Sequence, residues 1–240
     1  MPTILVTGAA SGIGAAFVDA YQASPDNNII AVDRHRVEHA AQNVDVIEVD
    51  VRNEASVQTL AHRVGDRPLD LVIHSAGVRG LVPAMESSTP GNVAACETRG
   101  VMDAETLTRA FQVNTVGTFL VLRALLPNLR RTAGKVVVMS SRMGSIGNNE
   151  HPNRAAGSAY AYRASKAAQN MIVRSLAADE QDITFVLCHP GRVESKLVKW
   201  REEDAISARE SVEGMLPLIQ RWSKQDSGMF YDRFGDRVEW

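Results

Sequence analysis

Apolar residues form short continuous runs that alternate with stretches of helical spacing along most of the chain. The continuous runs are typical of strands buried on both faces, and they cover residues 3–7, 28–33, 44–49, 69–74, 134–139, 183–188 and, more briefly, 228–231. Helical spacing follows the first glycine-rich turn to about residue 23 and recurs at 53–64, 103–131, 159–179 and 207–222. Because strands and helices alternate, the pattern predicts an α/β fold with a parallel sheet, right-handed crossovers and helices on both faces.

Two polar segments interrupt this alternation. Residues 78–102 carry two prolines and three glycines among small polar residues, which predicts a long loop with one short helix. A second polar loop, 144–158, precedes the helix expected at 159–179. The sequence shows no internal repeat and no second domain, so residues 1–240 are expected to form a single domain.

Composition narrows the class of protein. A formal net charge of −2 gives no global bias toward nucleic acid or an anionic membrane. Cys96 and Cys188 are too far apart in sequence to indicate a metal site. The first strand begins at residue 3, and no apolar run approaches the roughly 20 residues of a membrane span. We therefore expect a cytoplasmic protein with no metal, nucleic-acid or membrane partner.

The first strand ends in a glycine-rich turn that opens a helix. Gly8 allows a tight turn, Gly12 lets a pyrophosphate approach the backbone, and Gly14 lets the helix pack close to the sheet. The free N–H groups and the dipole of the helix N-terminus favour phosphate binding. A plain strand-to-helix turn is the alternative, but the flanking elements favour a dinucleotide site. Asp33 follows Gly14 by 19 residues, where a ribose-binding carboxylate is expected.

Tyr162 and Lys166 are four residues apart on the helix expected at 159–179, so they share one face. A free tyrosine has a pKa near 10, and a cation one turn away lowers that pKa by favouring the phenolate. The pair therefore suits general acid/base chemistry on a substrate oxygen. Taken alone, such a pair is more often a packed ring beside a solvated amine. Tyr160 lacks this spacing and is expected to lie well round the helix.

Two further polar positions admit both a structural and a functional interpretation. Asn114 lies inside the apolar helix expected at 103–131, where a buried amide is either a satisfied core group or a placed functional one. Ser141 follows the strand at 134–139, and its hydroxyl either caps a turn or points into the crevice where ligands of parallel sheets bind.

Together these motifs resemble the short-chain dehydrogenase/reductase family nearly from end to end, and within it the C-factor-like, or sniffer-like, carbonyl reductase branch. The resemblance implies a doubly wound Rossmann fold with a parallel sheet of about seven strands. Asn114, Ser141, Tyr162 and Lys166 match the family's catalytic tetrad. The matching cofactor positions, which also include Tyr162 and Lys166, are Gly8, Ser11, Gly12, Ile13, Gly14, Asp33, Arg34, Asp50, Val51, Ser75, Ala76, Gly77, Pro190, Gly191, Val193 and Ser195. The chain departs from the family at His74-Ser75, where Asn-Asn often precedes Ala-Gly, and at Ser195, where the family more usually has Thr.

The resemblance implies hydride transfer between a nicotinamide cofactor and a carbonyl or secondary alcohol. Tyr162 is then the general acid/base, Lys166 lowers the pKa of Tyr162 and holds the nicotinamide ribose, Ser141 bonds the substrate oxygen, and Asn114 anchors a water. A cofactor-binding signalling protein, or a non-redox activity on the same scaffold, is the alternative. A homodimer or homotetramer is also implied.

Asp33 favours NAD over NADP, because a 2′-phosphate would meet a like charge there, whereas the neighbouring Arg34 favours NADP. The substrate walls are expected from residues 79–102, 142–158 and 192–207, the last of which is also expected to act as a lid.

Overall fold

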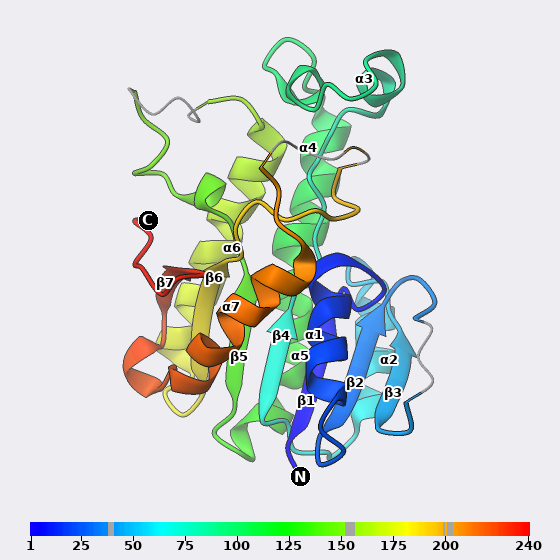
Figure 1. Cartoon of the computed structure of the whole chain (residues 1–240), viewed down its shortest axis with the longest axis vertical. Helices are drawn as coiled ribbons and strands as arrows, with labels where there is room; N and C mark the ends of the chain where they lie inside the picture. Colours follow the sequence, from blue (N-terminus) through cyan, green and yellow to red (C-terminus); the bar gives the residue numbers. More distant parts are fainter. Residues whose placement is uncertain (38–40, 152–156, 199, 201–203) are drawn as a thin grey trace.

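All seven strands of this computed structural model belong to one parallel sheet, which confirms the predicted fold class (Figure 1). The structure describes residues 1–37, 41–151, 157–198, 200 and 204–240. The strands are β1 (Thr3–Thr7), β2 (Asn28–Asp33), β3 (Val44–Glu48), β4 (Leu71–His74), β5 (Lys135–Met139), β6 (Thr184–His189) and β7 (Met229–Asp232). Their order is β3-β2-β1-β4-β5-β6-β7, so the direction of winding reverses between β1 and β4, and ligands of such sheets bind outside the carboxyl ends at that reversal.

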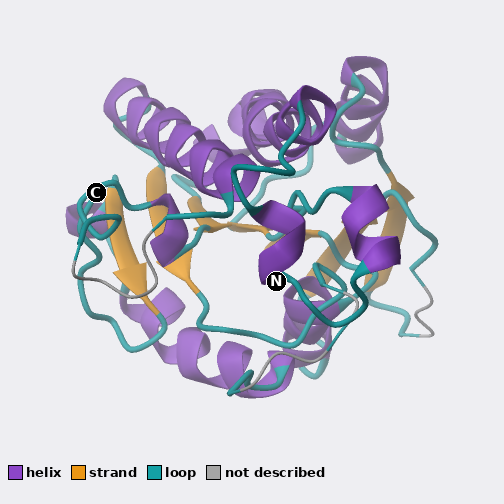
Figure 2. Cartoon of the chain, turned by 90° about the horizontal axis from the view of Figure 1, so that it is seen from above, coloured by secondary structure: helices purple, strands orange, loops and turns teal. Residues whose placement is uncertain are grey.

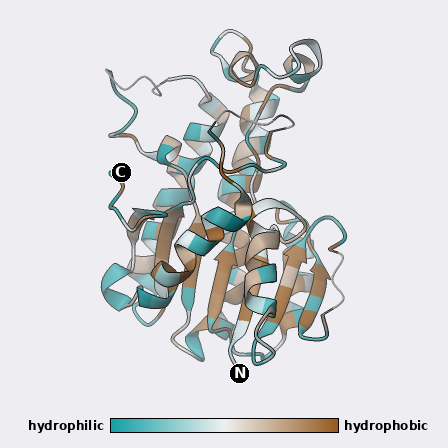
Figure 3. Ribbon diagram, viewed as in Figure 1, coloured by the Kyte–Doolittle hydropathy of each residue, from teal (hydrophilic) through white to brown (hydrophobic). Residues whose placement is uncertain are grey.

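Helices cover both faces of the sheet (Figure 2). Helices α1 (Gly12–Gln22) and α7 (Ala208–Arg221) pack on one face, and α2 (Glu54–Val64), α5 (Gly117–Arg130) and α6 (Tyr160–Asp179) on the other. Successive strand residues point to opposite faces, so Leu5 joins one hydrophobic core and Val6 the other. This double burial explains why the strands are apolar along their length (Figure 3).

The helix predicted at 103–131 contains a change of helical type. It consists of α4 (Ala104–Phe111), a π-helical turn at Gln112–Val116, and α5. By length and composition, its span from Ala104 to Arg130 could cross a membrane, but 61% of its most apolar window is buried inside the protein, as for a core helix. Asn114 lies within the π turn, which sequence periodicity did not indicate.

The segment predicted as a loop at 78–102 carries two short helices rather than one. These are α3 (Pro83–Ser88) and the 3-10 turn Ala94–Glu97, and they lie beyond the carboxyl edge of the sheet at the top of Figure 1. Two further 3-10 turns occupy Arg142–Gly144 and Lys224–Asp226. Parts of the other expected substrate walls, at 152–156, 199 and 201–203, lie outside the described residues.

Candidate active site

The glycine turn after β1 is built by close backbone contacts. Gly8 has a φ of +72°, and a Cβ there would lie 2.9 Å from the backbone nitrogen of Ala76. A Cβ on Gly14 would lie 2.1 Å from the carbonyl oxygen of Gly8. Neither position accepts a side chain without a shift of the backbone. The turn therefore lies directly on the end of β4, and α1 starts with its free N–H groups at the reversal of strand order.

A cavity of about 340 Å³ extends along this edge of the sheet. Most of the predicted cofactor residues line it, namely Gly8, Ser11, Gly12, Ile13, Asp33, Arg34, Asp50, Val51, Ser75, Ala76, Gly77, Tyr162, Lys166, Pro190 and Ser195. Gly14, Gly191 and Val193 are not among its lining residues. Val193 instead forms a bridge with Ile206 that holds the loop after β6 together. The cavity thus joins the glycine turn to the Tyr162–Lys166 pair, as one bound dinucleotide requires.

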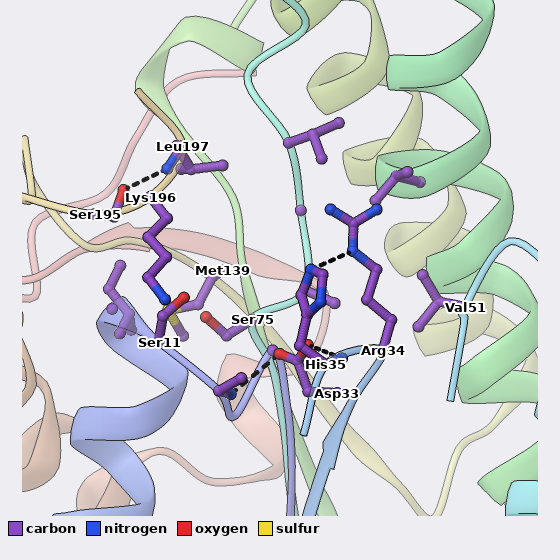
Figure 4. A pocket seen from close by; sticks show the side chains of 18 of the residues that line it. Ser11, Asp33, Arg34, His35, Val51, Ser75, Met139, Ser195, Lys196 and Leu197 are labelled. Carbon is purple, nitrogen blue, oxygen red and sulfur yellow. Dashed lines mark hydrogen bonds between the residues drawn. The ribbon is translucent and has the colours of Figure 1, made fainter. Parts of the chain in front are cut away.

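One end of the cavity is ringed by charged side chains near the surface (Figure 4). The Asp33 carboxylate accepts hydrogen bonds from the backbone N–H groups of Ala10 (3.1 Å) and His35 (2.9 Å). Arg34 Nε lies 3.1 Å from His35 Nε2, so Asp33, Arg34 and His35 form one connected group. We call this the adenine end of the cavity, because a ribose-binding acid marks that half of a dinucleotide site.

Asp50 and Arg52 form an ion pair at the same end. Arg52 Nη2 lies 2.6 Å from Asp50 Oδ2, with about a third of each side chain exposed (32% for Asp50, 39% for Arg52). The hydrogen bond from the Arg52 guanidinium lowers the pKa of the Asp50 carboxyl below its usual range. Asp50 is therefore ionised around neutral pH.

The other end of the cavity, which we call the catalytic end, is formed by buried side chains of α6. Tyr162 is 8% exposed, and Lys166 Nζ lies 5.8 Å from the centroid of its ring. Lys166 Nζ donates to the carbonyl oxygen of Met139 (2.8 Å) and to Gln169 Oε1 (2.9 Å). An ammonium has three protons, so one remains for the cavity. Burial lowers the pKa of Lys166 to about 7. By contrast, Tyr160 is 43% exposed.

The two remaining members of the predicted tetrad do not line the cavity. The Asn114 side chain accepts from the backbone N–H of Val78 (2.8 Å) and donates to the carbonyl of Val78 (2.9 Å) and to Ser165 Oγ (2.9 Å). Ser141 Oγ accepts from the backbone N–H of Met143 and caps the 3-10 turn that follows. Asn114 thus fixes the chain just after Gly77. The direct roles expected for Asn114 and Ser141 stay predictions.

Sequence reasoning missed a buried hydrogen-bonded chain behind Lys166. Gln169 Nε2 donates to Thr118 Oγ1 (2.8 Å), and Thr118 Oγ1 donates to the backbone carbonyl of Asn114 (2.7 Å). Since Thr118 has only one proton, His74 Nε2, 3.0 Å away, must donate to it. His74 Nδ1 then accepts from Thr7 Oγ1 at 3.0 Å. These contacts assign His74 a single neutral tautomer, in agreement with burial, which lowers the His74 pKa to about 3.

This chain, which we call the buried network, ends at the backbone of β4's carboxyl end. Thr7 Oγ1 accepts from the backbone N–H groups of Ser75 and Ala76, so the network links the glycine turn to the catalytic lysine. The departure from the family pattern at His74 is a sequence signal that could have indicated this network. Gln169 also gave a signal, since it is a polar residue one turn after Lys166 on the same helix.

Two more cations at the cavity were not predicted. Lys196 lines it, and its side chain reaches from the loop after β6 toward the turn that carries Ser11 (Figure 4). Arg79 lines it beside Tyr162 and forms an ion pair with Glu97. Each is a charged residue just after a motif that the sequence did single out, Ser75–Gly77 for Arg79 and Ser195 for Lys196. That adjacency is the signal that could have found them.

The comparisons with known proteins agree with this geometry. The family model described as short chain dehydrogenase matches residues 2–205. C-signal of Myxococcus xanthus is 36% identical over 187 residues, which cover 77% of this chain and 100% of C-signal. The 1-hydroxy-2-glutathionyl-2-methyl-3-butene dehydrogenase of Rhodococcus sp. (strain AD45) is 30% identical over 247 residues, with 100% of both proteins covered.

Among solved structures, the NADPH-bound carbonyl reductase from chicken fatty liver is similar to this chain. It superposes with a TM-score of 0.83 at 26% identity, covering 100% of this chain and 99% of the reductase. The likeness therefore includes the whole sheet and both ends of the cavity. The family match, which ends at residue 205, spans each of the predicted site residues from Gly8 to Ser195.

Proposed function

We propose that Tyr162 is the general acid and base of this chain, which belongs to the short-chain dehydrogenase family. The protein is an oxidoreductase that transfers a hydride between a nicotinamide cofactor and a carbonyl or alcohol substrate. The family predicted from sequence is thereby confirmed, together with its C-factor-like carbonyl reductase branch. The observation that supports the role of Tyr162 is its position beside Lys166 on α6, at the end of a cavity that begins at the glycine turn.

The residues present suit a dinucleotide. Close backbone packing at Gly8 and Gly14 leaves the N-terminus of α1 open for a pyrophosphate, and Asp33 is available for a ribose. Lys196 adds a cation that faces the same turn. When bound, the nicotinamide supplies or accepts the hydride, and the protein contributes orientation and proton transfer.

Proton transfer is assigned to the catalytic end. In the direction of reduction, the Tyr162 hydroxyl donates a proton to the substrate oxygen as that oxygen gains charge, and in oxidation the phenolate takes the proton back. Lys166 is held by Met139 and Gln169, with one proton left for the cavity, and its charge favours the phenolate. The apolar lining from Val78, Val113 and Leu197 supports a partly apolar carbonyl compound as substrate.

We further propose that NAD(H) is preferred over NADP(H). The Asp33 carboxylate lies at the adenine end, where a 2′-phosphate would be repelled. Arg34 argues for NADP(H), and the similar chicken enzyme is NADPH-bound, but Arg34 is already engaged by His35. The acid therefore carries the preference in this proposal.

Titration calorimetry with NAD⁺ and NADP⁺ at matched ionic strength tests the preference. We expect NAD⁺ to bind at least about tenfold tighter, which is roughly 1.4 kcal/mol. Asp33→Ala is expected to narrow or reverse the gap, and Asp19→Ala, an exposed acid on α1 away from the cavity, serves as the control. Equal or tighter NADP⁺ binding by the unmutated protein would assign the site to Arg34. The activity itself is tested by NADH oxidation with a panel of ketones and aldehydes.

We also propose that the protein is a homodimer or homotetramer of the cytoplasm. Four large apolar side chains, Leu107, Phe111, Val116 and Phe119, are 37% to 43% exposed along the outer side of α4, the π turn and α5. An exposed apolar stripe of this kind supports a homodimer or homotetramer. The two free, buried cysteines suit the reducing cytoplasm, and a net charge of −2 gives no global bias toward nucleic acid.

A further inference from the structure

Arg79 places a guanidinium over the ring of the proposed catalytic tyrosine. Its Cζ atom lies 4.8 Å from the centroid of the Tyr162 ring, closer than Lys166 Nζ at 5.8 Å. The Arg79 side chain is 16% exposed and lines the same cavity. An arginine stays protonated at every pH at which a protein is folded. A permanent positive charge therefore faces the residue that must gain and lose a proton.

Glu97 fixes this guanidinium in place. Arg79 donates Nε to Glu97 Oε2 and Nη2 to Oε1, both at 2.9 Å, and the Glu97 side chain is 8% exposed. The backbone carbonyl of Glu97 accepts from Ala159 N (3.0 Å) and Ser158 Oγ (3.1 Å), directly before α6 begins. The same residue thus anchors both the cation and the start of the helix that carries Tyr162, so their relative position is set by one short segment.

The ion pair between Arg79 and Glu97 has a defined orientation relative to the Tyr162 ring. Arg79 contacts the Tyr162 ring and both oxygens of the Glu97 carboxylate. The positive member of the pair therefore lies against the ring. The negative charge weakens the field at the ring but does not reverse it.

The other charged groups around Tyr162 do not supply the same field. On α6 itself, Lys166 is buried, and its pKa of about 7 leaves it only partly charged near neutral pH. Arg163 donates to the backbone carbonyls of Gly157, Ser158 and Met143, and its charge interacts with those of Arg79 and Glu97. Among the described residues of the neighbouring elements, Arg109 of α4 donates to Leu81 O, Arg142 of the 3-10 turn pairs with Asp232, and His74 of β4 is neutral.

We propose that Arg79, anchored by Glu97, is a second cation of the catalytic tyrosine and stabilises the Tyr162 phenolate together with Lys166. The proposal rests on the function proposed for Tyr162 and adds a residue to it. It explains how the site keeps a positive charge at the tyrosine above the pH at which Lys166 loses its own. An opposite charge within about 4–6 Å of an ionising group lowers its pKa by about one unit or more. The 4.8 Å separation runs to the centre of the ring and the Glu97 charge opposes the effect, so we expect about one unit.

The direct test is a spectrophotometric titration of the phenolate, with Tyr162→Phe subtracted to isolate the signal of Tyr162. We expect Arg79→Met to raise the apparent pKa of Tyr162 by about one unit and Arg79→Lys to raise it by less than half as much. Because Arg79→Met leaves the buried Glu97 without its bidentate partner, Arg79→Met/Glu97→Gln is titrated too. The double variant is expected to shift the apparent pKa in the same direction by a smaller amount. Arg174→Met, which removes an exposed guanidinium farther along α6 that donates to the carbonyl of Gly228, is the control and should shift it least.

The second readout is the pH profile of kcat/KM for alcohol oxidation, which rises as Tyr162 ionises. Arg79→Met should move the rising limb upward by the same unit, a loss of about tenfold on that limb. An unmoved titration and profile, with only KM raised for substrates that carry an anion, would overturn the proposal and make Arg79 a substrate-binding residue. The titration needs no turnover. The proposal about Arg79 can therefore be rejected independently of the proposed function. The proposed function would be rejected if the Tyr162→Phe variant were as active as the unmutated protein.

Discussion

The two ends of the cavity are built on opposite principles. At the catalytic end, Lys166, Gln169 and His74 are buried, and each polar atom of the buried network has an assigned partner. At the adenine end, Asp50 and Arg52 form a partly exposed pair of the kind that contributes little to stability. The catalytic end holds its side chains in fixed positions through buried hydrogen bonds, whereas the adenine end places charged side chains near the surface.

This difference teaches where the protein tolerates change. A buried hydrogen-bonded group that loses its partner costs about 1–3 kcal/mol, whereas an exposed ion pair contributes about 0.2–1 kcal/mol. The chemistry is therefore tied to the core of the fold. In the proposed function, the choice of cofactor depends on a few side chains near the surface, where we expect substitutions to leave the fold intact.

The largest effect is expected from the hydroxyl of Tyr162. Tyr162→Phe keeps the buried ring but removes the general acid/base, so we expect turnover to fall at least about a hundredfold, equivalent to about 2.7 kcal/mol. Steady-state carbonyl reduction with saturating cofactor measures it. Tyr160→Phe removes a hydroxyl from the same helix at an exposed position and should lose far less. The reverse order of the two variants would show that the wrong tyrosine has been assigned.

An intermediate effect is expected from His74, as a dependence of stability on pH. An unfolded histidine has a pKa near 6.5, whereas burial holds the folded value at about 3. Between these values the unfolded state binds more protons, so the free energy of unfolding decreases as the pH falls. His74→Asn removes this titration and should be less stable than the unmutated protein near pH 7.5, by about 1–3 kcal/mol.

The difference in free energy of unfolding between the unmutated protein and His74→Asn should then narrow by about 1–2 kcal/mol near pH 5. Only the protein with His74 loses stability there through this titration. Urea unfolding at the two pH values measures the difference. His189, whose pKa burial lowers to about 4, is present in both proteins and cancels. A gap that stays constant with pH would mean that His74 binds protons equally in the folded and unfolded states.

The smallest effect is expected at the adenine end. Arg52→Ala removes the ion pair with Asp50, and we expect the free energy of unfolding to fall by less than about 1 kcal/mol, and by less still at high salt. Arg209→Ala, which breaks the exposed pair with Glu213 on α7, should behave alike in urea unfolding. A loss of several kcal/mol for Arg52→Ala alone would show that the adenine end is as rigid as the catalytic end.

Local patterns in the sequence predicted most of this fold. Strands buried on both faces give continuous apolar runs, and the glycine turn has spacing that its backbone contacts require, so the sheet and the cofactor cradle were predictable. Contacts between distant segments were not. Arg79 and Glu97 are 18 residues apart in a segment predicted as a loop, and His74 and Thr118 are 44 apart. Which polar side chains meet there depends on the packing of α4, α5 and α6 on the sheet.

The π turn at Gln112–Val116 has one consequence for how this protein can change length. A π turn holds one residue more than an α turn, so deleting a single residue within it would restore regular helical hydrogen bonding. The deletion would leave the faces of α4 and α5 in their present phase, because the π turn and the α turn that replaces it each complete about one revolution. Thr106 and Ala110 would therefore stay buried, and α4 would keep its packing on α6. A deletion inside α4 or α5 would instead rotate the two parts by about 100°, so the loss of one residue is tolerated better at this turn than elsewhere in the long helix.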